Sequence, residues 1–275
     1  MNKHIANCFY KRYFILILLV ASILFSGFKL AWDLVGEILV QAKDLQTDRL
    51  GNVYVISPSN QFTKYDSKGN LLSTLNYAYL GNISSVDASN PLELYLFYKE
   101  LNSVVFLDNN LAYRGRINLS DAGIMQASAA SRNYSNGLWV FDQGDLQLKK
   151  LDKDGKLVQE SGNSLQFTQS RNLNPNFIYD SGTRVFVNDS AVGIMVFDVF
   201  ANYLKTIPIK GLTKFKVIEE QLYYAQGGNL INYSMKSLLR DTLFLAKPIH
   251  GNYSLEKELL YLVQPDKIEI YRYNK

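Results

Sequence analysis

A short hydrophobic–aromatic–hydrophobic triplet recurs through most of this 275-residue chain. Its central aromatic residues are 41, 44, 47, 37 and 38 residues apart. Repeats of about forty residues are typical of the four-stranded blades of a β-propeller. The triplets are Val53–Val55, Leu94–Leu96, Leu138–Val140, Val185–Val187, Leu222–Tyr224 and Leu260–Leu262.

A second landmark follows each triplet at a nearly constant distance. A strand-like run ends 11 to 13 residues after the central aromatic, at Asp66, Asp108, Asp152, Asp198, Ser234 and Arg272. Between the runs lie Asp- and Gly-containing segments of the kind that form hairpin turns. The pattern therefore predicts an all-β protein, a six-bladed β-propeller of four-stranded blades. It predicts strands at 45–48, 52–57, 62–66 and 71–75 in blade one, and at 176–179, 184–188, 193–198 and 203–207 in blade four.

The sixth blade is one strand short at the end of the chain. After Tyr273 only two residues remain, whereas a strand-like segment, Glu37–Gln41, precedes blade one. A ring closes well when an N-terminal strand completes its last blade, because no sheet edge is then left exposed. We therefore expect the propeller to span residues 33–275 and to be closed near residues 37–41. The alternative is a helical stalk over residues 33–43.

Residues 1–32 have the features of an export signal. Lys3, Lys11 and Arg12 precede an apolar run from Phe14 to Phe28, which is typical of a secretory signal peptide. The run is short for a membrane span, and no clear cleavage motif follows it. A cleaved signal peptide and a retained N-terminal anchor helix are therefore both open, with a buried core helix as the remaining alternative. We expect an exported protein at the periplasm or the periplasmic face of a membrane.

The charge of the rest of the chain excludes one class of function. Four of the 29 basic residues lie in the first thirty positions, so 25 basic residues face 25 acidic ones in the body. Proteins that bind nucleic acids electrostatically carry clustered Lys and Arg. We expect no nucleic acid among the partners.

Blade one resembles an NHL-type repeat. The resemblance rests on Asp48-Arg-Leu-Gly-Asn-Val-Tyr-Val, a second strand ending at Tyr65-Asp66, and Gly69-Asn-Leu. It is partial in blade three and faint elsewhere, and it implies an NHL- or YncE-like six-bladed fold rather than an activity. The abundance of Asn, Lys and Tyr is similar to that of envelope proteins of the Bacteroidota. Two short O-glycosylation-like triplets, at Asp189 and Asp241, fit the same group.

The sequence offers little for catalysis or metal binding. One cysteine, Cys8, excludes internal disulfides, and only His4 and His250 could supply imidazole. Asp48 and Asp87 could contribute oxygen ligands near the axis, as in a lactonase-like calcium site, but an Asp at the end of an inner strand more often caps it. We predict no metal, no cofactor and no enzymatic activity, with a metal-dependent lactonase or lyase as the less favoured reading.

The remaining candidate is a protein-binding surface. Propellers commonly bind partners on the rim formed by the loops between second and third strands and by the crossings between blades, where Tyr and Arg often anchor interfaces. We expect a scaffold or accessory subunit of an envelope or secretion machine, similar to the type IX system, with membrane contact if the leader is retained. The alternative is a propeller that binds a carbohydrate or another small ligand. The candidate partner-binding residues are Tyr77, Tyr79, Lys99, Asp142, Gln143, Arg171 and Asn172.

Overall fold

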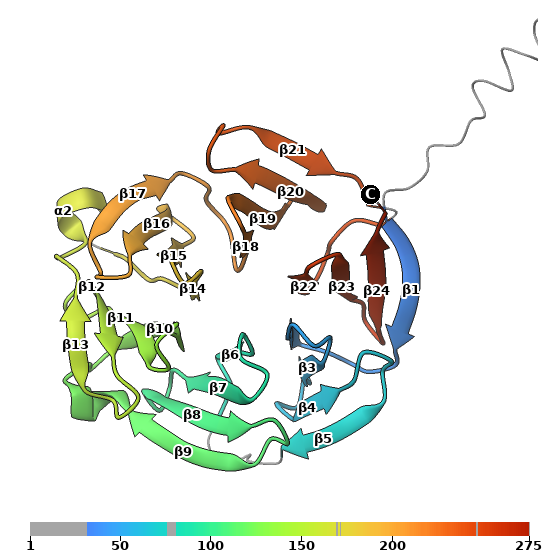
Figure 1. The fold of residues 1–275 in the computed structure, drawn as a ribbon, viewed down its shortest axis with the longest axis horizontal. Coiled ribbons are helices and arrows are strands. Elements are labelled where there is room, and N and C mark those ends of the chain that lie inside the picture. Colours follow the sequence, from blue (N-terminus) through green and yellow to red (C-terminus); the bar gives the residue numbers. More distant parts are fainter. Residues whose placement is uncertain (1–31, 76–80, 169, 171, 246, 275) are drawn as a thin grey trace, which may run out of the picture.

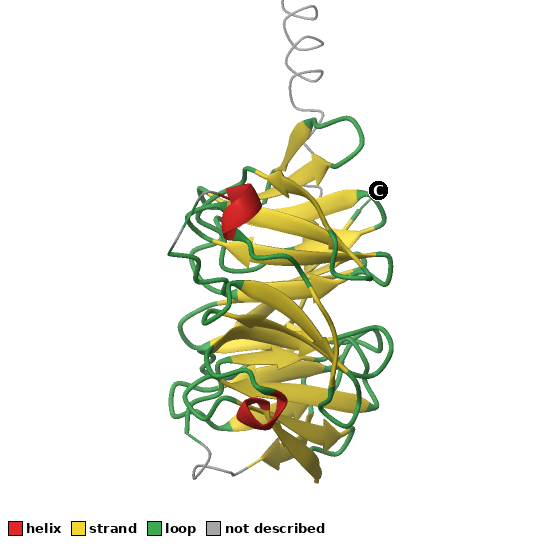
Figure 2. Cartoon of the chain, turned by 90° about the vertical axis from the view of Figure 1, so that its left-hand side faces the viewer, coloured by secondary structure: helices red, strands yellow, loops and turns green. Residues whose placement is uncertain are grey.

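The computed structural model describes residues 32–75, 81–168, 170, 172–245 and 247–274. They form a six-bladed β-propeller, as predicted, with six four-stranded antiparallel sheets arranged around a central axis (Figure 1). Viewed from the side, the molecule is a disc whose loops gather on two faces (Figure 2). Only two single-turn helices interrupt the described strands, η2 (Leu119–Ala122) and α2 (Leu165–Thr168).

Blades one to five are meanders whose strands run in sequence from the axis outward. Blades one to three are β2 (Asp44–Thr47), β3 (Val53–Ile56), β4 (Phe62–Tyr65), β5 (Leu71–Leu75); β6 (Ser85–Asp87), β7 (Glu93–Tyr98), β8 (Ser103–Asp108), β9 (Tyr113–Asn118); and β10 (Ala127–Arg132), β11 (Leu138–Asp142), β12 (Gln147–Leu151), β13 (Leu157–Glu160). Blades four and five are β14 (Phe177–Asp180), β15 (Arg184–Asp189), β16 (Gly193–Asp198), β17 (Tyr203–Ile207); and β18 (Lys216–Ile218), β19 (Gln221–Gln226), β20 (Asn229–Ser234), β21 (Arg240–Leu243).

Blade six takes its outermost strand from the N-terminal side. Its strands are β22 (Tyr253–Glu256), β23 (Leu259–Val263), β24 (Ile268–Tyr273) and β1 (Trp32–Ile38). β1 pairs antiparallel with β24, from Trp32 opposite Tyr273 to Ile38 opposite Ile268. The pairing covers the edge that β24 would otherwise expose.

The closing strand begins five residues before the predicted segment, and no helical stalk occupies residues 33–43. Trp32, which the sequence analysis placed in the leader, is the first residue of β1 and is buried. The predicted leader or anchor helix falls on residues 1–31, outside the described part of the chain, and the structure gives it no support. Within the described residues, no helix has the length and apolar character needed to cross a membrane.

The hydrophobic core lies between blades. In the described part of the chain, the buried apolar residues form six clusters, and each joins two neighbouring blades. The aromatic residue of the repeated triplet supplies much of this packing, for example Tyr54 between blades one and two and the fully buried Trp139 between blades three and four. Burial of such large side chains explains why the triplet recurs.

The alternating strand directions define two faces. The turns between first and second strands, here called inner turns, lie on one face, which we call the inner-turn face. The turns between second and third strands and the connections between blades lie on the opposite face, which we call the crossing face.

Candidate functional site

A cavity of about 90 Å3 lies on the propeller axis. Its lining comes from the first strands of all six blades and extends to the exposed Ser89 in an inner turn, so the cavity reaches the inner-turn face. Clefts that combine apolar walls with a few polar groups are the usual place for ligands. The polar lining includes Thr47, Asp87, Arg132, Tyr179, Lys216 and Ser254, one from each blade.

Two aspartates at the inner-turn end of the cavity tie neighbouring blades together. Asp87 of blade two accepts a 2.9 Å hydrogen bond from the backbone N–H of Arg132 in blade three. Asp180 of blade four accepts a 2.8 Å hydrogen bond from the Nε1–H of Trp139 in blade three. Each carboxylate also accepts a hydrogen bond within its own turn, from Ser89 and Gly182. Both side chains therefore have a structural role as well as a place in the cavity wall.

Two lysines of blade five reach towards other blades. Lys214 Nζ lies 2.8 Å from Asp44 Oδ1 of blade one, on the other side of blade six. Lys216 Nζ lies 2.6 Å from Glu256 Oε2 of blade six. Burial alone would lower the pKa of Lys216, but the nearby Tyr179 hydroxyl and Glu256 carboxylate outweigh it and raise the pKa above its ordinary value. Lys216 is therefore a permanent cation at neutral pH.

Arg132 at the end of β10 is the third cation of the cavity. Its Nη2 is hydrogen-bonded to Asn136 Oδ1 and lies 3.9 Å from Glu93 Oε2, while its guanidinium carbon lies 5.7 Å from the centre of the Tyr95 ring. Its Nε is buried and has no hydrogen-bond partner among the described residues. A buried donor without a partner is uncommon in folded proteins.

The described residues contain no group of three or more His, Cys, Asp or Glu side chains placed to hold a metal ion. Asp48, considered above as an oxygen ligand, instead caps the inner turn of blade one. It accepts hydrogen bonds from the N–H groups of Leu50 and Asn52 at 2.9 and 3.0 Å and from the Tyr54 hydroxyl at 2.9 Å. These bonds occupy the carboxylate.

The predicted partner-binding residues lie on or near the crossing face where they are described. Lys99 is exposed and reaches Asn174 Oδ1 at 3.3 Å, and Asn172 is exposed in the connection between blades three and four. Gln143 is half-buried and donates to the carbonyl of Leu173 at 2.9 Å. The structure thus brings Lys99, Gln143 and Asn172 to one connection, and their binding role stays a prediction. Tyr77, Tyr79 and Arg171 lie outside the described residues.

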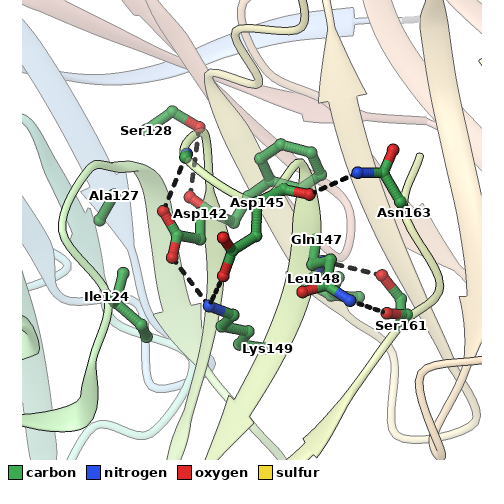
Figure 3. Close-up of polar contacts among 12 residues, drawn as sticks. Ile124, Ala127, Ser128, Asp142, Asp145, Gln147, Leu148, Lys149, Ser161 and Asn163 are labelled. Atoms are coloured by element: carbon green, nitrogen blue, oxygen red, sulfur yellow. Dashed lines mark hydrogen bonds and ion pairs between the residues drawn. The ribbon is translucent and has the colours of Figure 1, made fainter. Parts of the chain in front are cut away.

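Asp142 differs from the other candidates because it is inside blade three, only 2% exposed. Its carboxylate lies 2.8 Å from the equally buried Lys149 Nζ, which also pairs with Asp145 (Figure 3). The Asp142 side chain also accepts a hydrogen bond from the N–H of Gly144 at 3.0 Å. Asp142 therefore holds the turn in place, and a partner on the surface cannot reach it without opening the blade.

Sequence reasoning missed an apolar feature of the inner-turn face. Leu50, Leu92 and Tyr134 lie in the inner turns of blades one, two and three and are 65%, 66% and 81% exposed. They are spaced 42 residues apart in both steps. This constant spacing in polar turns is the signal that could have identified them. We call these three residues the apolar arc.

The inner turns of blades five and six are charged. They carry the exposed residues Glu219, Glu220, Lys257 and Glu258, three acids and one base. Glu220 lies 3.5 Å from Arg184 of blade four. The inner turns of blades five and six therefore carry a net negative charge, whereas those of blades one to three each expose one large apolar side chain.

Comparisons with known proteins show the fold and nothing finer. No family model and no curated protein matches the chain. Similar solved structures include virginiamycin B lyase from Staphylococcus aureus (TM-score 0.62, 11% identity, 88% of this chain and 100% of that chain). A second is the Swd1 propeller domain from Myceliophthora thermophila, with a TM-score of 0.60 and 10% identity over 88% of this chain and 100% of that chain. A third is BamB from Moraxella catarrhalis, with a TM-score of 0.55 and 12% identity over 88% of this chain and 100% of that chain. The NHL-type and Bacteroidota resemblances find no support in these comparisons.

The prediction that the chain is not an enzyme is contradicted by this result. One of the similar structures is a lyase, so the same ring architecture carries catalysis. The prediction relied on the scarcity of histidine, but activity depends on the side chains placed at a site and not on the fold or on a residue count.

Proposed function

We propose that this chain is an exported propeller of the cell envelope that binds a protein partner on its inner-turn face. The apolar arc is the observation that carries the proposal. Three large apolar side chains stand exposed in the inner turns of neighbouring blades. Exposed apolar groups that cluster on a rigid surface mark interaction sites.

The charge of the face favours a protein over a lipid surface. Membranes of the envelope carry anionic headgroups, which repel the acidic turns of blades five and six. A protein can instead pair apolar groups with the apolar arc and basic groups with Glu219 and Glu220. Such complementarity raises the association rate and fixes the orientation of the partner.

Location outside the cytoplasm is part of the same proposal. The basic start and the apolar run at Phe14–Phe28 support export, and an outer-membrane or secretion complex is the class of partner that fits an exported binding module. Mass spectrometry of the native N-terminus tests export. A chain that starts at Met1 and fractionates with the cytoplasm would contradict it.

Purification of the tagged full-length protein from native membranes in mild detergent tests partner binding. We expect a stoichiometric protein partner with the wild type and at least about a tenfold loss with Leu92→Asp/Tyr134→Asp, because charged side chains in an apolar contact cost more than 1.4 kcal/mol. Met125→Asp, at an exposed apolar residue of the crossing face, is the matched control and should retain the partner. Equal recovery with all three proteins would contradict the proposal, provided that their melting temperatures agree.

A further inference from the structure

The axial cavity presents hydrogen-bond donors that the protein itself does not use. Arg132 lines the cavity, and among the described residues its guanidinium donates a hydrogen bond only from Nη2, to Asn136 Oδ1, although the group has five N–H donors. Lys216 directs one N–H towards Glu256, and an ammonium group has three such donors. A ligand in this cavity therefore needs acceptor atoms.

The same cavity also presents acceptors. Asp87 accepts one hydrogen bond at each carboxylate oxygen, from Ser89 and Arg132, and a carboxylate can accept about four. Asp180 lines the wall as well. A ligand therefore also needs donor atoms, and a hydroxyl group is both donor and acceptor.

The cations around the cavity are all paired with carboxylates. Each of the three cations lies near a carboxylate: Lys214 near Asp44, Lys216 near Glu256 and Arg132 near Glu93. The two other carboxylates of the wall, Asp87 and Asp180, accept hydrogen bonds from blade three. An anionic ligand would meet Asp87 and Asp180 at short range, and a cationic ligand would meet Arg132 and Lys216. Since interactions between like charges are strong in a partly buried site, a neutral ligand is favoured.

The apolar part of the wall combines aliphatic side chains with four aromatic ones, Phe177, Tyr179, Phe215 and Tyr253. Aromatic side chains combined with a few convergent polar groups form a site for a small molecule that has both apolar and polar surface. At about 90 Å3 the cavity is small, but it reaches the inner-turn face, so a ligand can enter it in part.

From these four features we propose that the axial cavity binds a neutral, polyhydroxylated ligand, with one sugar residue inserted between Arg132 and Lys216. This site is separate from the apolar arc and does not depend on the proposed protein partner.

Saturation-transfer NMR on the full-length protein in detergent tests the inference with free sugars as probes. The neutral probes are D-glucose, D-galactose and D-mannose. The charged probes are D-glucuronate, an anion, and D-glucosamine, a cation at about pH 6, and both have the glucose ring. We expect at least one neutral sugar to bind with a millimolar dissociation constant and the charged forms of the ring to bind more weakly. Arg132→Met should weaken binding of that sugar about tenfold.

Two further variants fix the location of the site. Lys216→Met should weaken binding as Arg132→Met does, whereas Arg114→Met, which removes an exposed ion-paired cation from β9, should leave it unchanged. Melting curves confirm that each variant is folded. Binding that survives both cavity substitutions, stronger binding of a charged probe, or no binding of any neutral sugar would each overturn the inference.

Discussion

Lys149 is a charged side chain held inside blade three. Its side chain is 5% exposed, and it pairs with Asp142 and Asp145 in the turn that follows β11. Burial alone would lower the pKa of Lys149, but hydrogen bonds to the two carboxylates outweigh that effect and raise it. The lysine therefore stays charged and neutralises the buried Asp142.

Lys149→Met should destabilise the protein by about 3 kcal/mol, because it leaves the Asp142 carboxylate buried without a cation. Lys153→Met is the control, since Lys153 forms an exposed pair with Asp154 and the substitution should leave the stability nearly unchanged. Chemical denaturation of the two variants measures the difference. Equal stabilities of the two variants would show that the buried Asp142 carboxylate does not need Lys149 as its counter-ion.

The burial of Asp142 could not be predicted from the sequence because it depends on a pairing across a hairpin. The residue follows a hydrophobic strand and precedes Gln143 and Gly144, which is the pattern of an exposed turn. Only the pairing of β11 with β12 brings Lys149 beside it. Residue type and local pattern predicted the turn but not that the Asp142 side chain points into the blade.

At the scale of elements, four blades share one hydrogen-bonding pattern at the turn between their third and fourth strands. An aspartate at the end of the third strand accepts hydrogen bonds from the backbone N–H groups two and four positions later. These bonds lower the carboxyl pKa below its ordinary value of 3.8. For Asp66 the main cause is the hydrogen bond from the Asn70 side chain. For Asp108 and Asp152 it is the hydrogen bond from the backbone N–H of Ala112 and of Lys156, respectively. For Asp198, burial would raise the pKa, but the hydrogen bonds from Asn202 outweigh it.

These turns predict a loss of stability in acid. A carboxyl group whose pKa is lower in the folded state contributes stability above its unfolded pKa and loses it as the pH falls through the folded pKa. The melting temperature should therefore fall below about pH 4. Replacing all four aspartates by asparagine keeps the oxygen that accepts the two backbone hydrogen bonds but removes the titration, so the variant should lose less stability between about pH 5 and pH 3. Parallel acid profiles of variant and wild type would contradict this account.

The strands themselves were largely predictable from the sequence. In blades one and four, the predicted strands match the structure to within one residue at each end, because buried apolar runs and turn residues mark both ends. The closing strand β1 was harder to predict. β1 has a register shift between Leu34 and Gly36, which interrupts the alternation of buried and exposed residues, and Leu34 and Val35 are about half exposed. The segment at residues 37–41 therefore looked more like a strand than the true one did.

At the scale of the whole molecule, function depends on which side chains the ring collects on one face. Leu50, Leu92 and Tyr134 belong to different blades, and neither the charge of the turns nor the strand pattern within one blade reveals that they are neighbours. The repeat places them on one face because each lies in the inner turn of its blade. The axial cavity arises in the same way, since its polar residues come from six separate strands. The sequence predicted the ring, whereas the residues of each site could be grouped only once the strand pairing of all six blades was known.

Site-specific photo-crosslinking in the native cell tests the partner-binding face most directly. A photoreactive amino acid is placed at Leu92 in the apolar arc or at Met125 on the crossing face, in the full-length chain. We predict that position 92 crosslinks to one protein partner and that position 125 does not. Crosslinking to a protein only from position 125, to lipid from position 92, or from neither position would contradict the assignment of the inner-turn face.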